Sequence, residues 1–338
     1  MSRKNFDVFL TARDYDAITG LAETLGIDIE IFGRYGEDLY EKLIYEGERI
    51  STAARKLSEY RERILAGVAY PNPVEARVIY GVGKKLVVLS DSPHAVHPHR
   101  LTLSLASYLV FSDCISLNSW SEYTHARLKL RPYKGFDELS WFEEMPEVFS
   151  KRHIEVLGLR ELEYIVIRPE EFRASYYTWS PKAEFWKNIC ERILSKRLRV
   201  VILPRYRDQR EYFERVFRDS ILRGEVIVPE PRRAVGPALV RYSIATITGG
   251  GTIAREAALQ GVPGVITFPI TLEVDKCVTE LNLPLKYISE INRLDEFINA
   301  VARDPEKMRV DTRDTLRERR SPLETIYEIL REIALESK

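Results

Sequence analysis

Residues 245–269 decide the fold and read Ala245-Thr-Ile-Thr-Gly-Gly-Gly-Thr-Ile-Ala-Arg-Glu-Ala-Ala-Leu-Gln-Gly-Val-Pro-Gly-Val-Ile-Thr-Phe-Pro269. The residues before the glycines are apolar or β-branched, which predicts a short buried strand. The three glycines predict a sharp turn, and helical spacing follows from Thr252 to Gln260. Gly261 and Pro263 end this helix, so a further strand is expected from Val265 to Phe268.

A strand, a glycine turn and a helix start together form a pattern that binds anions. The first backbone N–H groups of the helix have no partner within it, the helix dipole is positive there, and glycine leaves room for a phosphate. The spacing matches neither Gly-x-Gly-x-x-Gly nor a P-loop. A phosphate site formed by Gly249, Gly250, Gly251 and Thr252 and a merely structural turn therefore both remain open.

Glu256 lies about one helical turn beyond the glycines, within reach of a sugar attached to a bound phosphate. A carboxylate accepts hydrogen bonds from two hydroxyl groups, and a ribose offers two. The alternative is an ordinary acid near a helix start, paired with Arg255.

The second half of the chain alternates short apolar strands with helices, which predicts a parallel sheet covered on both faces. Arg168-Pro-Glu170 follows the expected strand at 164–167, and Arg205 follows the next strand at 200–203. Right-handed crossovers place both arginines and the glycine turn at one edge of the sheet. Two arginines facing the turn favour an anionic ligand, because a guanidinium binds phosphate in a bidentate way and keeps its charge.

In the first half, the strand predicted at 86–90 ends in the loop Asp91-Ser-Pro-His-Ala-Val-His-Pro-His-Arg100. Ligands of open α/β sheets gather at such strand ends, so Asp91, His94 and His97 are candidates for a general-base set. The alternative is a polar loop whose histidines cap the next helix. The histidine spacing does not suit a metal site, and none is predicted.

Other elements are expected from the same patterns. Strands are predicted at 6–10, 27–32, 108–112 and 129–133, and helices at 15–25, 37–65 and 118–128. The stretch from 141 to 162 has mixed charge and little periodicity, as in a linker. We therefore predict a domain of residues 1–150, a second of residues 151–320 and a C-terminal helix of residues 321–338.

Composition excludes several classes of protein. The 338 residues are 45% hydrophobic and 30% charged, with 51 basic and 51 acidic residues. The absence of net charge disfavours nucleic acid as a partner. No apolar run is long enough to span a membrane, and no signal peptide is apparent. Three separated cysteines suit a reduced, cytoplasmic setting. Peripheral membrane contact, and the choice between monomer and homodimer, remain open.

The segment Gly250-Gly-Thr-Ile-Ala-Arg-Glu-Ala-Ala-Leu-Gln-Gly-Val-Pro263 resembles a signature of an archaeal and bacterial family, number 354 of the domains of unknown function. The family pattern is Gly-Gly-Thr-Met-x-Arg-Glu-Ala-Ala-Leu-x-Gly-x-Pro. Further segments agree in order along most of the chain: Thr11–Asp16, Asp91–Leu105, Tyr133–Glu138, Ile167–Glu170, Ala174–Tyr177, and Leu203–Arg205 with Gln209.

This family resembles GT-B glycosyltransferases and non-hydrolysing UDP-N-acetylglucosamine 2-epimerases. The resemblance implies two Rossmann-like domains facing a cleft, a pyrophosphate at the glycine turn and a ribose at Glu256. It also implies that Glu273 and Asp275 meet the donor sugar, with ordinary acids at a helix start as the alternative. The last helix is expected to return to the N-terminal domain. Relatives begin with an additional strand and helix, a unit expected to be missing here, so catalytic competence is open.

The combined prediction is a cytoplasmic, metal-independent glycosyltransferase that needs no cofactor and uses a UDP-type nucleotide sugar and an unknown acceptor. In it, Arg168 and Arg205 neutralise the leaving group, Glu170 belongs to the same ligand cluster, and His94 or His97 is the base. The alternatives are a UDP-N-acetylglucosamine 2-epimerase-like enzyme and a non-catalytic protein that binds nucleotide sugars.

Overall fold

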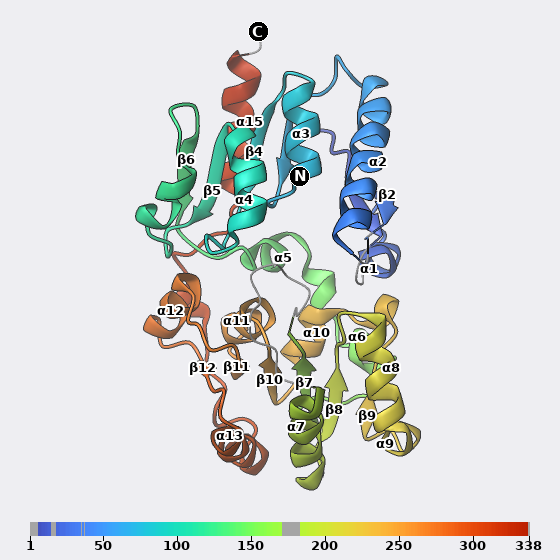
Figure 1. The fold of residues 1–338 in the computed structure, drawn as a ribbon. Helices are drawn as coiled ribbons and strands as arrows, with labels where there is room; N and C mark the ends of the chain where they lie inside the picture. The colour runs from blue at the N-terminus through green and yellow to red at the C-terminus, as the bar shows by residue number, and fades with distance from the viewer. Residues whose placement is uncertain (1–5, 15–17, 35, 37, 171–182, 337–338) are drawn as a thin grey trace. The chain divides into compact units, whose positions relative to one another are not determined.

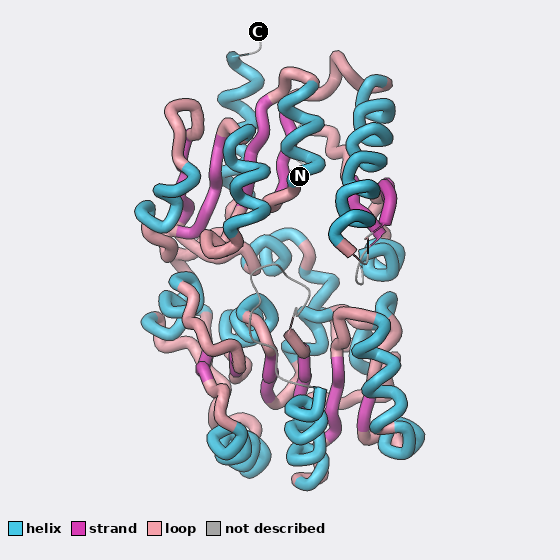
Figure 2. Tube along the Cα trace, viewed as in Figure 1, coloured by secondary structure: helices cyan, strands magenta, loops and turns pink. Residues whose placement is uncertain are grey.

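The computed structural model describes residues 6–14, 18–34, 36, 38–170 and 183–336 (Figure 1). The chain forms two compact units, the first from residues 1–19, 27–143 and 318–338 and the second from residues 20–26 and 144–317. All the described sheets are parallel. In each unit the strands lie among helices (Figure 2), as buried parallel strands require. The predicted α/β class with two Rossmann-like sheets is confirmed.

The sheet of the second unit has six strands in the order β12-β11-β10-β7-β8-β9. If β7 is taken as the first strand of the unit and β10 as the fourth, this is the doubly wound strand order of a Rossmann fold. In that fold the winding direction changes between the first and the fourth strand. Here that switch point lies between β7 and β10, which are neighbours with Thr248 beside Arg168. The strands are β7 (Tyr164–Arg168), β8 (Arg199–Ile202), β9 (Val226–Ile227), β10 (Ala245–Thr248), β11 (Gly264–Ile266) and β12 (Leu285–Tyr287).

Helices α7, α8 and α13 pack on one face of this sheet, where Trp186, Phe213 and Leu294 join the strands in one buried apolar cluster. A smaller cluster joins α10 to α11 through Val240 and Ala257. Cys190 belongs to the large cluster, and burial raises the pKa of its thiol. The helices of the unit are α6 (Arg152–Glu155), α7 (Ala183–Ser195), α8 (Arg207–Val216), α9 (Arg218–Leu222), α10 (Gly236–Arg241), α11 (Gly251–Leu259), α12 (Glu273–Glu280), α13 (Ile291–Arg303) and α14 (Arg313–Leu316).

The first unit contains a four-stranded sheet and a separate parallel pair of strands. The larger sheet has the order β3 (Ala66–Ala69), β4 (Lys85–Leu89), β5 (Tyr108–Ser112) and β6 (Lys129–Tyr133). The pair consists of β1 (Thr11–Asp14) and β2 (Glu30–Arg34). The strand predicted at 6–10 is therefore wrong by about one strand length, because the residues that find a partner strand are 11–14. No strand among the described residues pairs with both β1 and β3.

The helices of the first unit differ from the predictions mainly at their ends. Helix α1 (Ile18–Leu25), whose residues from Gly20 belong to the second unit, is close to the predicted span. Helix α2 (Leu39–Ser58) ends before the expected 65 and is followed by a turn at 59–63. The segment 117–123 forms a 3₁₀ helix, shorter than the helix predicted there, and short helices replace the expected linker around 141–162. The remaining helices are α3 (Pro73–Gly81), α4 (Val96–Thr102) and α5 (Leu139–Glu144).

Helix α15 (Leu323–Glu336) packs on the sheet of the first unit (Figure 1). Ile326, Ile329 and Ile333 join Val87 and Val110 in a buried cluster. On the solvent side, Arg131 makes two hydrogen bonds with Glu332, at 2.8 and 3.0 Å. The last helix therefore completes the core of a sheet whose strands come from the first half of the chain.

Candidate functional site

The glycine turn lies at the switch point of the second sheet, where β7 and β10 end side by side. The amide of Gly249 donates to the carbonyl of Arg168 at 2.9 Å. A Cβ atom on Gly249 would stand 2.5 Å from the backbone nitrogen of Glu170 and 2.7 Å from its Cα. Only glycine lets the chain after β10 approach the chain after β7 this closely.

The turn is extended rather than left-handed. None of the glycines at 249–251 has a positive φ, and Gly250 has φ −150° and ψ 170°. Gly249 and Gly251 are thus needed for close approach, and none of the three is needed for a left-handed turn. Helix α11 begins at Gly251 with no hydrogen bond from a capping side chain, so its first amide groups are not used by a side-chain cap.

Arg205 extends toward this turn from the end of β8. Its Nη2 atom lies 3.8 Å from the position that a Cβ on Gly250 would take. Its Nε donates to the carbonyl of Pro169 at 3.2 Å, and its amide donates to Gln209 Oε1 at 2.8 Å. These contacts hold a half-buried guanidinium beside the start of α11.

Arg168 ends β7 beside Thr248, and its guanidinium contacts the backbone that follows β8. Its Nη1 donates to the carbonyls of Leu203 and Pro204, at 3.2 and 3.3 Å. Arg168 thereby ties the end of β7 to the end of β8, from which Arg205 extends. Its predicted role at a leaving group stays a prediction.

The predicted acids differ widely in exposure. Glu170 is 2% exposed, and Trp186 Nε1 donates to its Oε2 at 2.5 Å. Glu256 is 4% exposed on α11, whereas Glu273 and Thr252 are exposed at the starts of α12 and α11. The segment Ala174–Tyr177, which is part of the family resemblance, lies outside the described residues.

A buried hydrogen-bond network that the sequence analysis did not predict lies beside the glycine turn. Arg255 Nη1 donates to Asp275 Oδ1 at 2.7 Å with both side chains 1% exposed, and the Tyr287 hydroxyl donates to Oδ2 at 2.6 Å. A Cβ on Gly251 would lie 2.9 Å from Oδ2. Arg255 thus pairs with Asp275, and both side chains belong to this buried network. The predicted contact of Asp275 with a donor sugar stays a prediction.

In the first unit, the loop after β4 carries the histidines. Asp91 and His94 are half-buried, His97 is exposed on α4, and Ser92 Oγ donates to Asp91 Oδ1 at 2.7 Å. The buried histidine is His99, which the sequence analysis left out. Its Nδ1 lies 2.6 Å from the Ala95 carbonyl and its Nε2 lies 3.0 Å from Ser90 Oγ. Burial lowers the pKa of His99.

Both ring nitrogens of His99 are therefore used in hydrogen bonds of the fold. With Nδ1 donating to the carbonyl, Nε2 accepts from the Ser90 hydroxyl, and the neutral imidazole fixes the loop that carries Asp91. The signal that could have shown this is the four-residue spacing from Ala95 to His99, which one helical turn brings together.

Asp137 is a buried acid at the carboxyl edge of the sheet of the first unit. Its carboxylate accepts hydrogen bonds from the hydroxyls of Tyr70, at 2.6 Å, and Tyr133. Burial, strengthened by the Asp137 charge, raises the pKa of Tyr133 well above its usual value. Glu138, next in the chain, is 1% exposed. The tyrosines that end or follow β3 and β6 were the available signal.

Among residues 6–14, 18–34, 36, 38–170 and 183–336, no group of three or more His, Cys, Asp or Glu side chains is placed to hold a metal ion. None of the helices in that part of the chain is both long enough and apolar enough to cross a membrane.

Comparison with known sequences identifies one family. The model of DUF354, described as a protein of unknown function, matches residues 1–335. An uncharacterized protein from Methanocaldococcus jannaschii is 25% identical over 318 residues, which cover 88% of this chain and 84% of that protein.

Solved structures share the fold at low sequence identity. UDP-N-acetylglucosamine 2-epimerase from Rickettsia bellii gives a TM-score of 0.68 at 10% identity, covering 97% of this chain and 90% of that one. The Neisseria meningitidis UDP-GlcNAc 2-epimerase bound to UDP-GlcNAc gives 0.65 at 15%, covering 99% and 94%. UGT73P12 from Glycyrrhiza uralensis gives 0.54 at 10%, covering 98% and 91%. The fold is thus GT-B-like, as predicted.

Proposed function

This chain belongs to the DUF354 family, and we propose that its second unit holds the diphosphate of a nucleotide sugar at the start of α11. The observation that carries the proposal is the close approach of Gly249 to the backbone of Glu170 at the switch point of a doubly wound sheet. Ligands of such sheets bind in the crevice at this point. The helix start supplies amide donors and a positive dipole end.

The residues around the turn have separate roles in this proposal. The amides at 250–252 and the exposed Thr252 hydroxyl are the phosphate donors. Arg205 is the cation, since it lies beside Gly250 and keeps its charge at any relevant pH. Glu256, farther along α11, accepts from the ribose, and Glu273 accepts from the sugar. Arg168 and Glu170 hold the two strand ends in position.

The leading activity in this proposal is epimerisation at carbon 2 of a UDP-linked N-acetylhexosamine. It is supported by the fold shared with several structures titled UDP-N-acetylglucosamine 2-epimerase, one of them bound to UDP-GlcNAc. Epimerisation must remove the proton from carbon 2 and return a proton to the opposite face. Asp91, His94 and His97, at the carboxyl end of β4, are the candidate proton carriers.

Glycosyl transfer is the second candidate, supported by the likeness to UGT73P12, which was solved with glycyrrhetinic acid 3-O-monoglucuronide. Here His94 or His97 would remove the acceptor's hydroxyl proton. Incubation with UDP-GlcNAc in D₂O separates the two activities. Epimerisation predicts the carbon-2 epimer with deuterium at carbon 2 and no acceptor required, which ¹H NMR detects. Transfer predicts no change until an acceptor is present.

Two alanine variants of neighbouring glycines test the nucleotide site itself. Gly249→Ala places a Cβ against the Glu170 backbone, whereas a Cβ on Gly250 meets only Arg205 Nη2 at 3.8 Å, an ordinary contact. We expect Gly249→Ala to weaken UDP binding at least about tenfold and Gly250→Ala to change it little, as measured by calorimetry. Equal affinities in the two variants, or no binding of UDP to the parent protein, would overturn the proposal.

A further inference from the structure

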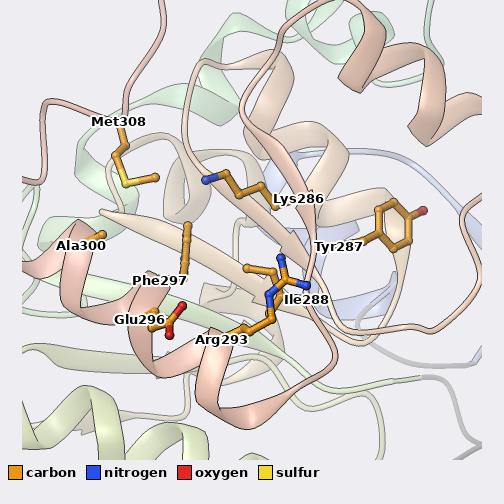
Figure 3. Close-up of a pocket in the computed structure, with 8 residues that line it drawn as sticks. All are labelled: Lys286, Tyr287, Ile288, Arg293, Glu296, Phe297, Ala300 and Met308. Carbon is orange, nitrogen blue, oxygen red and sulfur yellow. The ribbon is translucent and has the colours of Figure 1, made fainter.

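A cavity of about 490 Å³ lies at the edge of the second sheet, away from the glycine turn (Figure 3). Strand β12 forms one wall and α13 forms another. In strand order, β11 separates β12 from the strand that carries the turn. The lining residues are Lys286, Tyr287, Ile288, Arg293, Glu296, Phe297, Ala300 and Met308. A volume of this size is typical of sites for small molecules.

The floor of the cavity is formed by residues at the edge of the large apolar cluster of the second unit. Ile288 and Phe297 belong to the large buried cluster, and Met308 packs against it. In Figure 3 Phe297 and Met308 face the same space, while the Tyr287 ring extends away from it. Tyr287 is turned to the opposite side of β12, where its hydroxyl meets Asp275. An aromatic ring and a thioether together suit a flat apolar ligand.

The rim of the cavity carries two cations from different elements. Lys286 is exposed on β12 and Arg293 is exposed on α13. Neither forms an ion pair with any residue that the structure describes, whereas Lys187, Arg192 and Lys276 of the same unit do. Glu296 is the one acid of the lining, so the rim has a net charge of one positive unit. Two unpaired cations over an apolar floor are complementary to an organic anion.

We propose that this cavity binds a small organic carboxylate with a flat apolar body. Lys286 and Arg293 hold the carboxylate, and the body lies on Phe297 and Met308. A hydroxyl or amine on the ligand can donate to Glu296. This site shares no side chain with the proposed nucleotide site, so the two proposals stand or fall separately.

The chain offers a local probe of this cavity, because it contains only three methionines, Met1, Met145 and Met308. In protein labelled with ¹³C at the methionine methyl groups, 2-naphthoate is titrated and the three signals are followed. Met308→Leu assigns the cavity signal. We expect the Met308 signal to shift and saturate while the Met145 signal stays in place. The neutral analogue 2-naphthamide is expected to bind at least about tenfold more weakly.

Charge variants complete the test. Lys286→Gln with Arg293→Gln is expected to weaken 2-naphthoate about tenfold and to leave 2-naphthamide unchanged. Arg303→Gln is the control, since Arg303 ends the same helix, is exposed and does not line the cavity. A Met308 signal that does not move at about 10 mM 2-naphthoate, a weak limit for a site, contradicts the proposal. So does equal affinity for 2-naphthoate and 2-naphthamide.

Discussion

The fully buried Asp275 carboxylate is stabilised by a charged partner and a neutral donor. Arg255 neutralises it, and Tyr287 satisfies its second oxygen. Burial, with the Asp275 charge, raises the pKa of the Tyr287 hydroxyl, which therefore remains a donor at neutral pH. An ion pair in the core costs desolvation and needs complete hydrogen bonding to persist. At Asp275 these partners fix α11 and α12 beside the glycine turn.

The burial of His99 predicts how the free energy of unfolding depends on pH. The pKa of the folded imidazole lies below its unfolded value of 6.5, because burial disfavours the charged form. As pH falls below 6.5 the unfolded chain therefore binds more protons than the folded chain, and stability declines. We expect His99→Gln to reduce the slope of unfolding free energy against pH between about 7 and 5, by up to about 1.4 kcal/mol per pH unit.

The measurement is urea unfolding of the parent and the variant at a series of pH values. His97→Gln is the matched control, since His97 lies on the same helix and is exposed. A His99→Gln protein whose slope equals that of the parent would show that His99 takes up its proton in the folded state as readily as in the unfolded state.

At the scale of elements, α3 shows how a cap overrides a polar pattern. The stretch after Tyr70 is polar and no helix was predicted there, yet a helix begins at Pro73. The Asn72 side chain accepts hydrogen bonds from the amides of Val74 and Glu75, at 3.1 and 3.4 Å. Asparagine before proline is a strong start signal for a helix, and it was available in the sequence.

Substitutions on the two sides of helix α15 are predicted to differ in their effect on stability. Ile329 is completely buried against β4 and β5, so Ile329→Ala leaves a cavity and is expected to destabilise the protein by about 2–5 kcal/mol. Glu328→Ala, on the exposed side of the same helix, is expected to change stability by less than about 1 kcal/mol. Chemical denaturation measures both. Equal effects would mean that α15 does not complete the core of the first unit.

At the scale of the whole molecule, the second unit is nearly one continuous segment. Residues 144–317 contain its entire six-stranded sheet and its large apolar cluster. The first unit instead needs residues from both ends of the chain, because α15 packs on β4 and β5. A continuous segment with its own core meets the condition for independent folding.

We therefore expect a fragment of residues 144–317 to fold on its own, with a cooperative thermal transition followed by circular dichroism. It loses the contact of the segment 20–26, in which Thr24 donates to the Arg232 carbonyl, an exposed bond of small effect. A fragment without a cooperative transition would show that this unit depends on the first for stability. The matching fragment 1–143 lacks α15 and is expected to fail.

The sequence alone determined the second unit in most of its length. Its short apolar strands alternate with helices, and this local pattern suffices because buried parallel strands are apolar on both faces. The glycine turn and the arginines at the strand ends were found in the same way. The candidate roles of Asp91, His94 and His97 remain predictions, as do those of Glu256 and Glu273.

Only the tertiary structure decided which polar groups are used by the fold itself. Asp275 and Glu273 stand two residues apart near one helix start, but one is buried against Arg255 and the other is exposed. His99 and His97 divide in the same way. Burial depends on the elements that pack from distant parts of the chain, and a local pattern carries no information about them. The same reason explains why β1 lies at Thr11–Asp14, since a strand is fixed by its partner.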